Sequence, residues 1–131
     1  MIKFLADTNI FIRIFIQDNL GQTASAQKYL DQAKVGKIKL KVISELMPEI
    51  EYVLRKVYKI KREEIVDKLL LIIEASYIDI EKRDEWEKSI KIYKNNNIDL
   101  IDAFLYTIKL RDDMKILTFD KDFKKIKSSF K

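Results

Sequence analysis

Apolar residues recur along this chain in two patterns, short continuous runs and helix-spaced stripes. Short runs are typical of buried strands, whereas apolar residues recurring every three or four positions are typical of amphipathic helices. The runs predict strands at residues 2–6, 38–42, 77–80 and 115–119. The stripes predict helices at about 10–18, 23–35, 44–58, 62–75, 83–95 and 99–111, with a short turn or helix near 121–127.

Strands that alternate with helices predict βαβ units and a parallel sheet with helices on both faces. The predicted fold class is therefore α/β, as a three-layer α/β/α sandwich around a central parallel sheet. Two glycines and one proline leave no sign of a linker, and the length of 131 residues suits one domain, residues 1–131. In such sheets ligands bind beyond the carboxyl ends of the strands.

The amino-acid composition limits which catalytic groups the protein can use. Hydrophobic residues make up 47% of the chain, enough for a core, but cysteine and histidine are both absent. Their absence excludes disulfides, thiol chemistry, histidine-dependent triads and the commonest transition-metal ligand. Any catalysis must use carboxylates, hydroxyls, amines or a metal ion.

Charge and targeting patterns bear on location and partners. The longest apolar run is too short to span a bilayer, and no basic leader precedes an apolar stretch, so we expect a cytoplasmic protein without a signal peptide. The net charge of +5 is compatible with a nucleic-acid partner. The abundance of lysine and isoleucine is equally compatible with an AT-rich genome or a thermophile.

Two acids follow apolar strands at opposite ends of the chain. Asp7 comes directly after the first predicted strand, and Asp120 after the last. Both are expected where this architecture places its sites, with Asn9 and Thr118 as polar neighbours that orient the carboxylates. The alternatives are that Asp7 is a helix N-cap and that Asp120 and Asp122 form a turn.

Two helices supply further candidate acids. Asp99 and Asp102 begin the helix at 99–111, where Asp99 suits the N-cap and Asp102 stands beside an apolar stretch or favours the helix N-terminus. In the helix at 44–58, Glu49 lies roughly 80° from the centre of the apolar stripe, nearer than Glu45 and Glu51 at roughly 120°. Glu49 is thus predicted nearest the buried face, with a solvated glutamate as the alternative.

A meeting of Asp7, Glu49, Asp102 and Asp120 would need a cation. Carboxylates a few ångströms apart repel, which raises pKa values and costs stability unless a cation neutralises them. A ligand set of oxygens alone selects Mg²⁺ or Mn²⁺. Such an ion lowers the pKa of bound water and stabilises a leaving oxygen, which supplies a nucleophile without histidine.

These segments resemble a known family. The stretches FLADTNIFIR, PEIEYVLRKVYKIKREEI, NNNIDLIDAFLYT and ILTFDKDFKKI, in this order, are similar to the PIN-domain family, specifically the VapC-like toxins of type II toxin–antitoxin pairs. The resemblance covers nearly the whole chain. It implies that the four acids named above are catalytic metal ligands, and that Asn9, Asp99, Thr118 and Asp122 are auxiliary.

The resemblance also implies a reaction and partners. It implies a Mg²⁺- or Mn²⁺-dependent endoribonuclease that hydrolyses RNA phosphodiester bonds with water and leaves a 5′-phosphate and a 3′-hydroxyl. A homodimer and a cognate antitoxin protein are further expectations of the family. Basic runs at 34–41 and 55–62 and lysines near Asp120 are candidate RNA contacts, as is Arg13.

Other functions remain open at this stage. A PIN nuclease of RNA processing, outside any toxin–antitoxin pair, would carry the same acids. A non-catalytic PIN-like binding module usually lacks some of them, and a response-regulator receiver domain needs a late-strand lysine and an N-terminal acid pair that this chain does not match.

Overall fold

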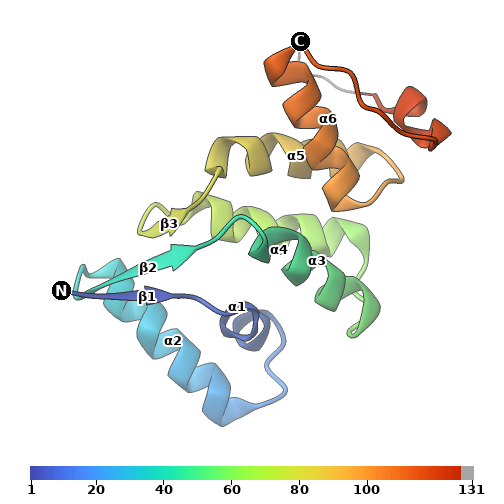
Figure 1. The fold of residues 1–131 in the computed structure, drawn as a ribbon. Helices are drawn as coiled ribbons and strands as arrows, with labels where there is room; N and C mark the ends of the chain where they lie inside the picture. Colours follow the sequence, from blue (N-terminus) through green and yellow to red (C-terminus); the bar gives the residue numbers. More distant parts are fainter. Residues whose placement is uncertain (128–131) are drawn as a thin grey trace.

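Three parallel strands form one sheet in the computed structural model, which describes residues 1–127. They are β1 (Ile2–Leu5), β2 (Ile38–Val42) and β3 (Ile78–Ile80), side by side in that order (Figure 1). Phe4 lies opposite Leu40, and Leu40 lies opposite Ile78. The first three predicted strands are confirmed to within a residue.

Six helices and one short 3₁₀ helix connect and follow the strands. They are α1 (Thr8–Phe15), α2 (Leu20–Lys34), α3 (Leu46–Lys56), α4 (Arg62–Glu74), α5 (Arg83–Asn95), α6 (Leu100–Asp112) and η1 (Lys121–Lys125). Every predicted helix is present, with ends shifted by a few residues. Local signals explain some of these ends: the Asn19 side chain accepts from the Gln22 amide to start α2, and Gly36 adopts a φ of 81° in the turn after it.

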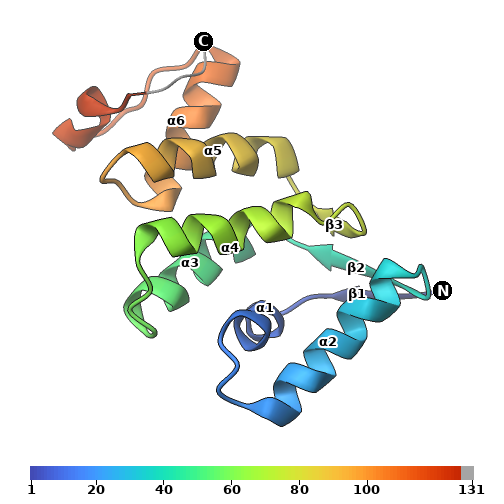
Figure 2. The same ribbon diagram turned by 180° about the vertical axis from the view of Figure 1, so that it is seen from behind.

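One face of the sheet is covered by α2 and α4. Both helices lie behind the strands in Figure 1 and in front of them in Figure 2, as two right-handed crossovers in the same direction require. The core between these layers includes Val42, Ile50 and Leu69, which are fully buried. Alternate strand residues such as Lys39, Lys41 and Asp79 are exposed and help line a groove of about 790 Å³ over the strands.

Helices α5 and α6 continue outward from α4. α5 packs on α4 and α6 packs on α5, so α6 stands far from β1 in both views (Figures 1 and 2). Trp86 of α5 stacks on Phe104 of α6 with ring centroids 4.1 Å apart. Ser89 donates a buried hydrogen bond of 2.8 Å to Thr107. α6 is therefore fixed to α5 along much of its length.

The fourth predicted strand, 115–119, is wrong for the described part of the chain. These residues form no helix or strand and pair with no strand, and Leu117 and Phe119 are 103% and 107% exposed. An apolar run becomes a strand only beside a sheet edge, and α6 carries this run away from β1. We call residues 114–119 the arm. Residues 128–131, the end of the predicted domain, lie outside the described residues.

Within residues 1–127, no helix combines the length and apolar character that crossing a membrane requires.

Candidate active site

Asp7 stands at the carboxyl end of β1 and begins α1. Its Oδ1 accepts a hydrogen bond of 2.8 Å from the Thr8 amide, so the N-cap role is confirmed, while the side chain stays exposed. Asn9 is also exposed, in the first turn of α1. The Thr8 hydroxyl is the contrast: Thr8 is 4% exposed, and its Oγ1 has no hydrogen-bond partner among the described residues. A buried hydroxyl without a partner costs free energy.

The two glutamates of α3 have the opposite burial to the one predicted. Glu51 is 3% exposed, whereas Glu49 lies on the exposed side of the helix. The helical-wheel prediction is wrong because α3 packs against α1 on one side and against α4 and α6 on others, so a single apolar stripe does not define its buried surface. Exposure leaves the Glu49 carboxylate accessible to a cation or a substrate.

Glu51 is held in a polar network that the sequence did not reveal. Its carboxylate accepts 2.7 Å hydrogen bonds from the Tyr93 hydroxyl and from Arg55 Nε. Burial, followed by the bond to Glu51, holds the pKa of Tyr93 well above its usual range. The Arg62 guanidinium lies 3.9 Å from the centre of the Tyr93 ring and donates to the carbonyl oxygens of Tyr93 and Ile98. The network ties α3 and α4 to α5 and to the loop that leads to the acids of α6.

Asp102 is subject to the charges of three other acids in the last third of the chain. Asp102 is half-buried in the first turn of α6, and its pKa is raised, first by burial and then by the charges of Asp99, Asp120 and Asp122. Asp99 occupies the predicted N-cap position, but its side chain makes no capping hydrogen bond. Asp102 is therefore set among like charges that a bound cation would neutralise.

Asp120 and Asp122 are fixed by local hydrogen bonds. Asp120 Oδ1 accepts from the Asp122 amide at 2.8 Å, and the Asp120 amide donates to Thr118 Oγ1 at 3.0 Å. The predicted turn is thus confirmed, and Thr118 holds the backbone of Asp120. The Asn96 side chain exchanges two 2.9 Å hydrogen bonds with the Lys127 backbone, which places η1 beside the loop before α6.

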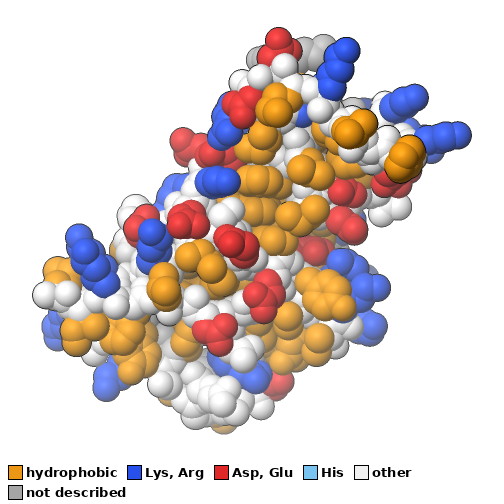
Figure 3. Space-filling model, viewed as in Figure 1, with side chains coloured by type: hydrophobic (Ala, Val, Ile, Leu, Met, Phe, Trp, Pro, Cys, Tyr) orange, Lys and Arg blue, Asp and Glu red, His pale blue; other side chains and the backbone are white. Residues whose placement is uncertain are grey.

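The predicted acids thus fall into two groups. Asp7 and Glu49 belong to α1 and α3, which pack together, whereas Asp99, Asp102, Asp120 and Asp122 gather at α6 and η1. Figure 3 shows acidic side chains across the middle of one face of the molecule. In residues 1–127 no three acids are arranged to hold a metal ion together. Their convergence stays a prediction.

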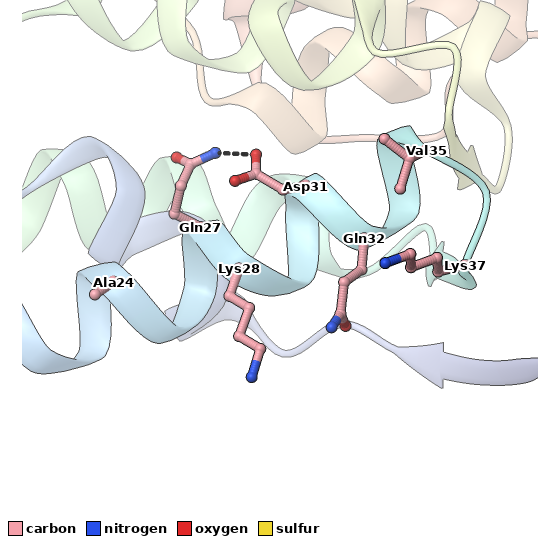
Figure 4. Close-up of a pocket in the computed structure, with 7 residues that line it drawn as sticks. All are labelled: Ala24, Gln27, Lys28, Asp31, Gln32, Val35 and Lys37. Carbon is pink, nitrogen blue, oxygen red and sulfur yellow. Dashed lines mark hydrogen bonds between the residues drawn. The ribbon is translucent and has the colours of Figure 1, made fainter.

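Other predicted contacts are placed as follows. The Arg13 guanidinium donates to Gln22, Asp18 and Tyr58, at 2.7, 2.9 and 3.4 Å. A shallow pocket of about 510 Å³ lies along α2 and the turn after it, where Gln27 donates to Asp31 at 2.8 Å (Figure 4). None of the predicted site residues lines this pocket. A hollow of about 230 Å³ between the loop before α6 and η1 includes Asp122 and Lys125.

Comparison with known proteins identifies the class. Residues 4–128 match the family model of the PIN domain, so the chain belongs to the PIN-domain family, which is generally a nuclease fold. The predicted fold class, a PIN-like α/β/α sandwich with a parallel sheet, is confirmed. No curated protein and no solved structure matches the chain.

The chemistry of the candidate ligand atoms indicates which metal ion they would bind. The grouped side chains are carboxylates, and the whole chain contains no histidine or cysteine. Oxygen donors without nitrogen or sulfur favour Mg²⁺ or Mn²⁺ over zinc or copper. The residues present therefore fit the divalent metals that PIN-domain nucleases generally use.

Proposed function

We propose that this protein is a Mg²⁺- or Mn²⁺-dependent endoribonuclease that hydrolyses RNA phosphodiester bonds. The observation that carries the proposal is the raised pKa of Asp102 among Asp99, Asp120 and Asp122, in a chain of the PIN-domain family. Asp7, Glu49, Asp102 and Asp120 would hold the cation. When bound, it supplies charge neutralisation at the scissile phosphate and lowers the pKa of a water molecule.

The chain's own residues position the acids and the substrate in this proposal. Asp120 is oriented by Thr118 through its backbone and by its bond to the Asp122 amide. Asp99 and Asp122 add negative charge that strengthens cation binding at Asp102. Exposed Lys121, Lys124, Lys125 and Lys127 surround η1 and would attract the RNA backbone toward the acids.

We further propose that the nuclease is the toxin of a VapBC-type pair, acting in the cytoplasm and inhibited by a cognate antitoxin. This part rests on the resemblance of the four acidic segments to VapC-like toxins. Induced expression of the wild-type chain should arrest growth, and Asp7→Asn should not. Growth arrest that a small neighbouring gene relieves supports the toxin role, whereas a nuclease without growth arrest supports an RNA-processing enzyme.

Cleavage of a labelled structured RNA tests the nuclease. The wild type is compared with Asp7→Asn, Asp102→Asn and the control Asp67→Asn, which changes an exposed acid of α4. We expect Mg²⁺- or Mn²⁺-dependent cleavage by the wild type and the control, and loss with either site variant while circular dichroism shows an intact fold. Cleavage that survives EDTA or both site substitutions contradicts the mechanism.

A further inference from the structure

The outer edge of β1 is exposed. Within residues 1–127, β1 pairs only with β2, and Ile2 and Leu5 are 64% and 72% exposed. Strands of parallel sheets are normally buried on both faces. An exposed apolar edge is a template on which another strand can pair.

The arm is suited to pair with the outer edge of β1, where no strand is paired within residues 1–127. Its backbone belongs to no helix or strand, and Leu117 and Phe119 are exposed as fully as in an unfolded chain. The arm is long enough to match the four residues of β1. Like β1, it is an apolar run followed by an aspartate, Asp120.

Topology gives the arm a place beside β1. The crossovers from β1 to β2 and from β2 to β3 run in one direction across the sheet. A connection from β3 back to the outer edge of β1 runs in the opposite direction. Because such connections are right-handed, its helices belong over the face that α2 and α4 leave uncovered. A groove lies over that part of the sheet, and it is lined in part by Lys3, Lys39 and Lys41.

The arm of the same chain is held away from this edge. Trp86, Ser89 and Glu85 fix α6 to α5, the last through an ion pair with Arg111. Beyond the arm, Asn96 holds the Lys127 backbone beside the loop before α6. Pairing of the arm with its own β1 would have to break these contacts, whereas the β1 edge of a second molecule can approach the arm where it stands.

We propose that two copies of this chain exchange their arms, each arm pairing in parallel with β1 of the other copy. Parallel pairing places Asp120 of one copy at the same end as Asp7 of the other, and Asp102 accompanies Asp120. Each acidic site then takes Asp7 and Glu49 from one molecule and Asp102 and Asp120 from the other. The exchange is a closed two-fold arrangement. The composite site rests on the proposed nuclease function, whereas the exchange itself does not.

Two further observations support the exchange. The buried Thr8 hydroxyl, which lacks a hydrogen-bond partner in residues 1–127, directly follows Asp7, the residue beside which the incoming strand would end. Large exposed apolar side chains also gather on the elements concerned: Ile2, Phe4, Leu5, Ile101, Leu105, Met114, Leu117 and Phe119. At roughly 60–120 Å² for each side chain, they offer on the order of 700 Å² per copy, close to the roughly 800 Å² that a standard interface buries on each partner.

Oligomeric state is the first test. Light scattering after gel filtration should give a dimer of the 15.6 kDa chain. Phe119→Asp should give a monomer with an unchanged circular dichroism spectrum, because this side chain makes no buried contact in one molecule. The control Leu20→Asp, which changes another largely exposed apolar residue at the start of α2, should remain a dimer. A monomeric wild type, or a dimer that survives Phe119→Asp, overturns the exchange.

Cross-linking distinguishes the second molecule from the same chain. Because the chain has no cysteine, Ile2→Cys and Lys115→Cys can be made as separate proteins, mixed, refolded together and oxidised. We expect covalent dimers that contain one chain of each kind, and none when Ile2→Cys is mixed with Lys28→Cys on the outer side of α2. The double variant Ile2→Cys/Lys115→Cys should also form covalent dimers. A disulfide confined to single chains means that the arm pairs with its own β1 and overturns the exchange.

Activity complementation tests the composite site. Asp7→Asn and Asp102→Asn are refolded together, so that half of the dimers are hybrids and each hybrid retains one intact site. We expect recovery of roughly a quarter of the wild-type cleavage rate, although each variant alone is inactive. No recovery in a mixture that still cross-links overturns the composite site. An inactive wild type that still cross-links overturns the nuclease proposal and leaves the exchange standing.

Discussion

β1 and the arm have nearly the same sequence pattern and different structures. IKFLAD and KILTFD are both short apolar runs that end in aspartate. β1 pairs with β2 over four residue positions, whereas the arm pairs with no strand and is largely exposed. The difference lies in their neighbours: β1 meets the edge of β2, and the arm leaves α6 at the far end of the molecule (Figure 1). Strand formation depends on cross-strand partners more than on the intrinsic preference of the residues.

The largest expected effect on activity concerns the acids that end these two segments. Asp7→Asn and Asp120→Asn should each lower metal-dependent RNA cleavage by at least roughly 100-fold, or about 2.7 kcal/mol of transition-state free energy. Asparagine still caps a helix, so both variants should fold. Asp113→Asn, an exposed acid at the end of α6, serves as the control in a steady-state cleavage assay. If only one of the two substitutions lowered cleavage, the aspartates of β1 and of the arm would not have equivalent roles.

The largest expected effect on stability concerns the packing of α5 on α6, the helix from which the arm extends. Trp86→Ala should lower the free energy of unfolding by about 3–5 kcal/mol, because it removes a buried ring that stacks on Phe104. Trp86→Phe keeps an aromatic ring and loses mainly the 2.9 Å hydrogen bond from Trp86 Nε1 to Ser44 Oγ, so its loss should be smaller. Urea unfolding measures both. Equal stability of Trp86→Ala and the wild type would contradict the packing of α6 on α5.

Tyr93→Phe weakens the link between α3 and α5. It leaves the buried Glu51 carboxylate one hydrogen bond short, so we expect a loss of about 1–3 kcal/mol near neutral pH. Folding raises the pKa of Tyr93, so the unfolded chain loses this proton at lower pH than the folded one, and wild-type stability should fall as pH rises above about 10.

Thermal unfolding of both proteins at neutral and alkaline pH tests this prediction. The exposed control Tyr52→Phe should behave like the wild type at both. If Tyr93→Phe loses stability at alkaline pH as steeply as the wild type, then Tyr93 is not the group responsible.

The smallest expected effect concerns the two hydrogen bonds between the Asn96 side chain and the Lys127 backbone, beyond the arm. Asn96→Ala removes both hydrogen bonds to the Lys127 backbone, which is exposed, so global stability should change by less than about 0.5 kcal/mol. Amide hydrogen exchange at Lys127 should nevertheless become faster than in the wild type. Asn97→Ala, an exposed neighbour, should leave that rate unchanged. Unchanged exchange in Asn96→Ala would mean that other contacts hold η1.

The sequence predicted the elements better than their contacts. The helices and first three strands follow from local periodicity, which the folded chain obeys wherever a neighbour buries the apolar side. The arm shows the limit, because whether KILTF pairs depends on where α6 ends, and that depends on contacts such as Trp86 with Phe104. No local pattern contains this information.

The sequence identifies the candidate acids by their position along the chain. Position along the chain does not determine which acids lie together in the fold. Asp7 and Asp120 follow apolar runs, and Asp102 stands beside an apolar stretch, so position along the chain picks them out. Glu51 was missed because a helical wheel assumes one buried side, and α3 has several neighbours. Its (i, i+4) spacing from Arg55 was the one available signal, and such pairs are common on exposed helix surfaces.

The separation of Asp7 from Asp120 along the chain also orders events during synthesis. Asp7 is made before the six α-helices described in residues 1–127, whereas Asp120 follows all of them. At roughly 5–20 residues per second, the two acids emerge on the order of ten seconds apart. A growing chain that carries β1, α1 and α3 therefore holds only part of its acids for that interval, and a ribosome making this protein is not exposed to a complete set until Asp120 has been added.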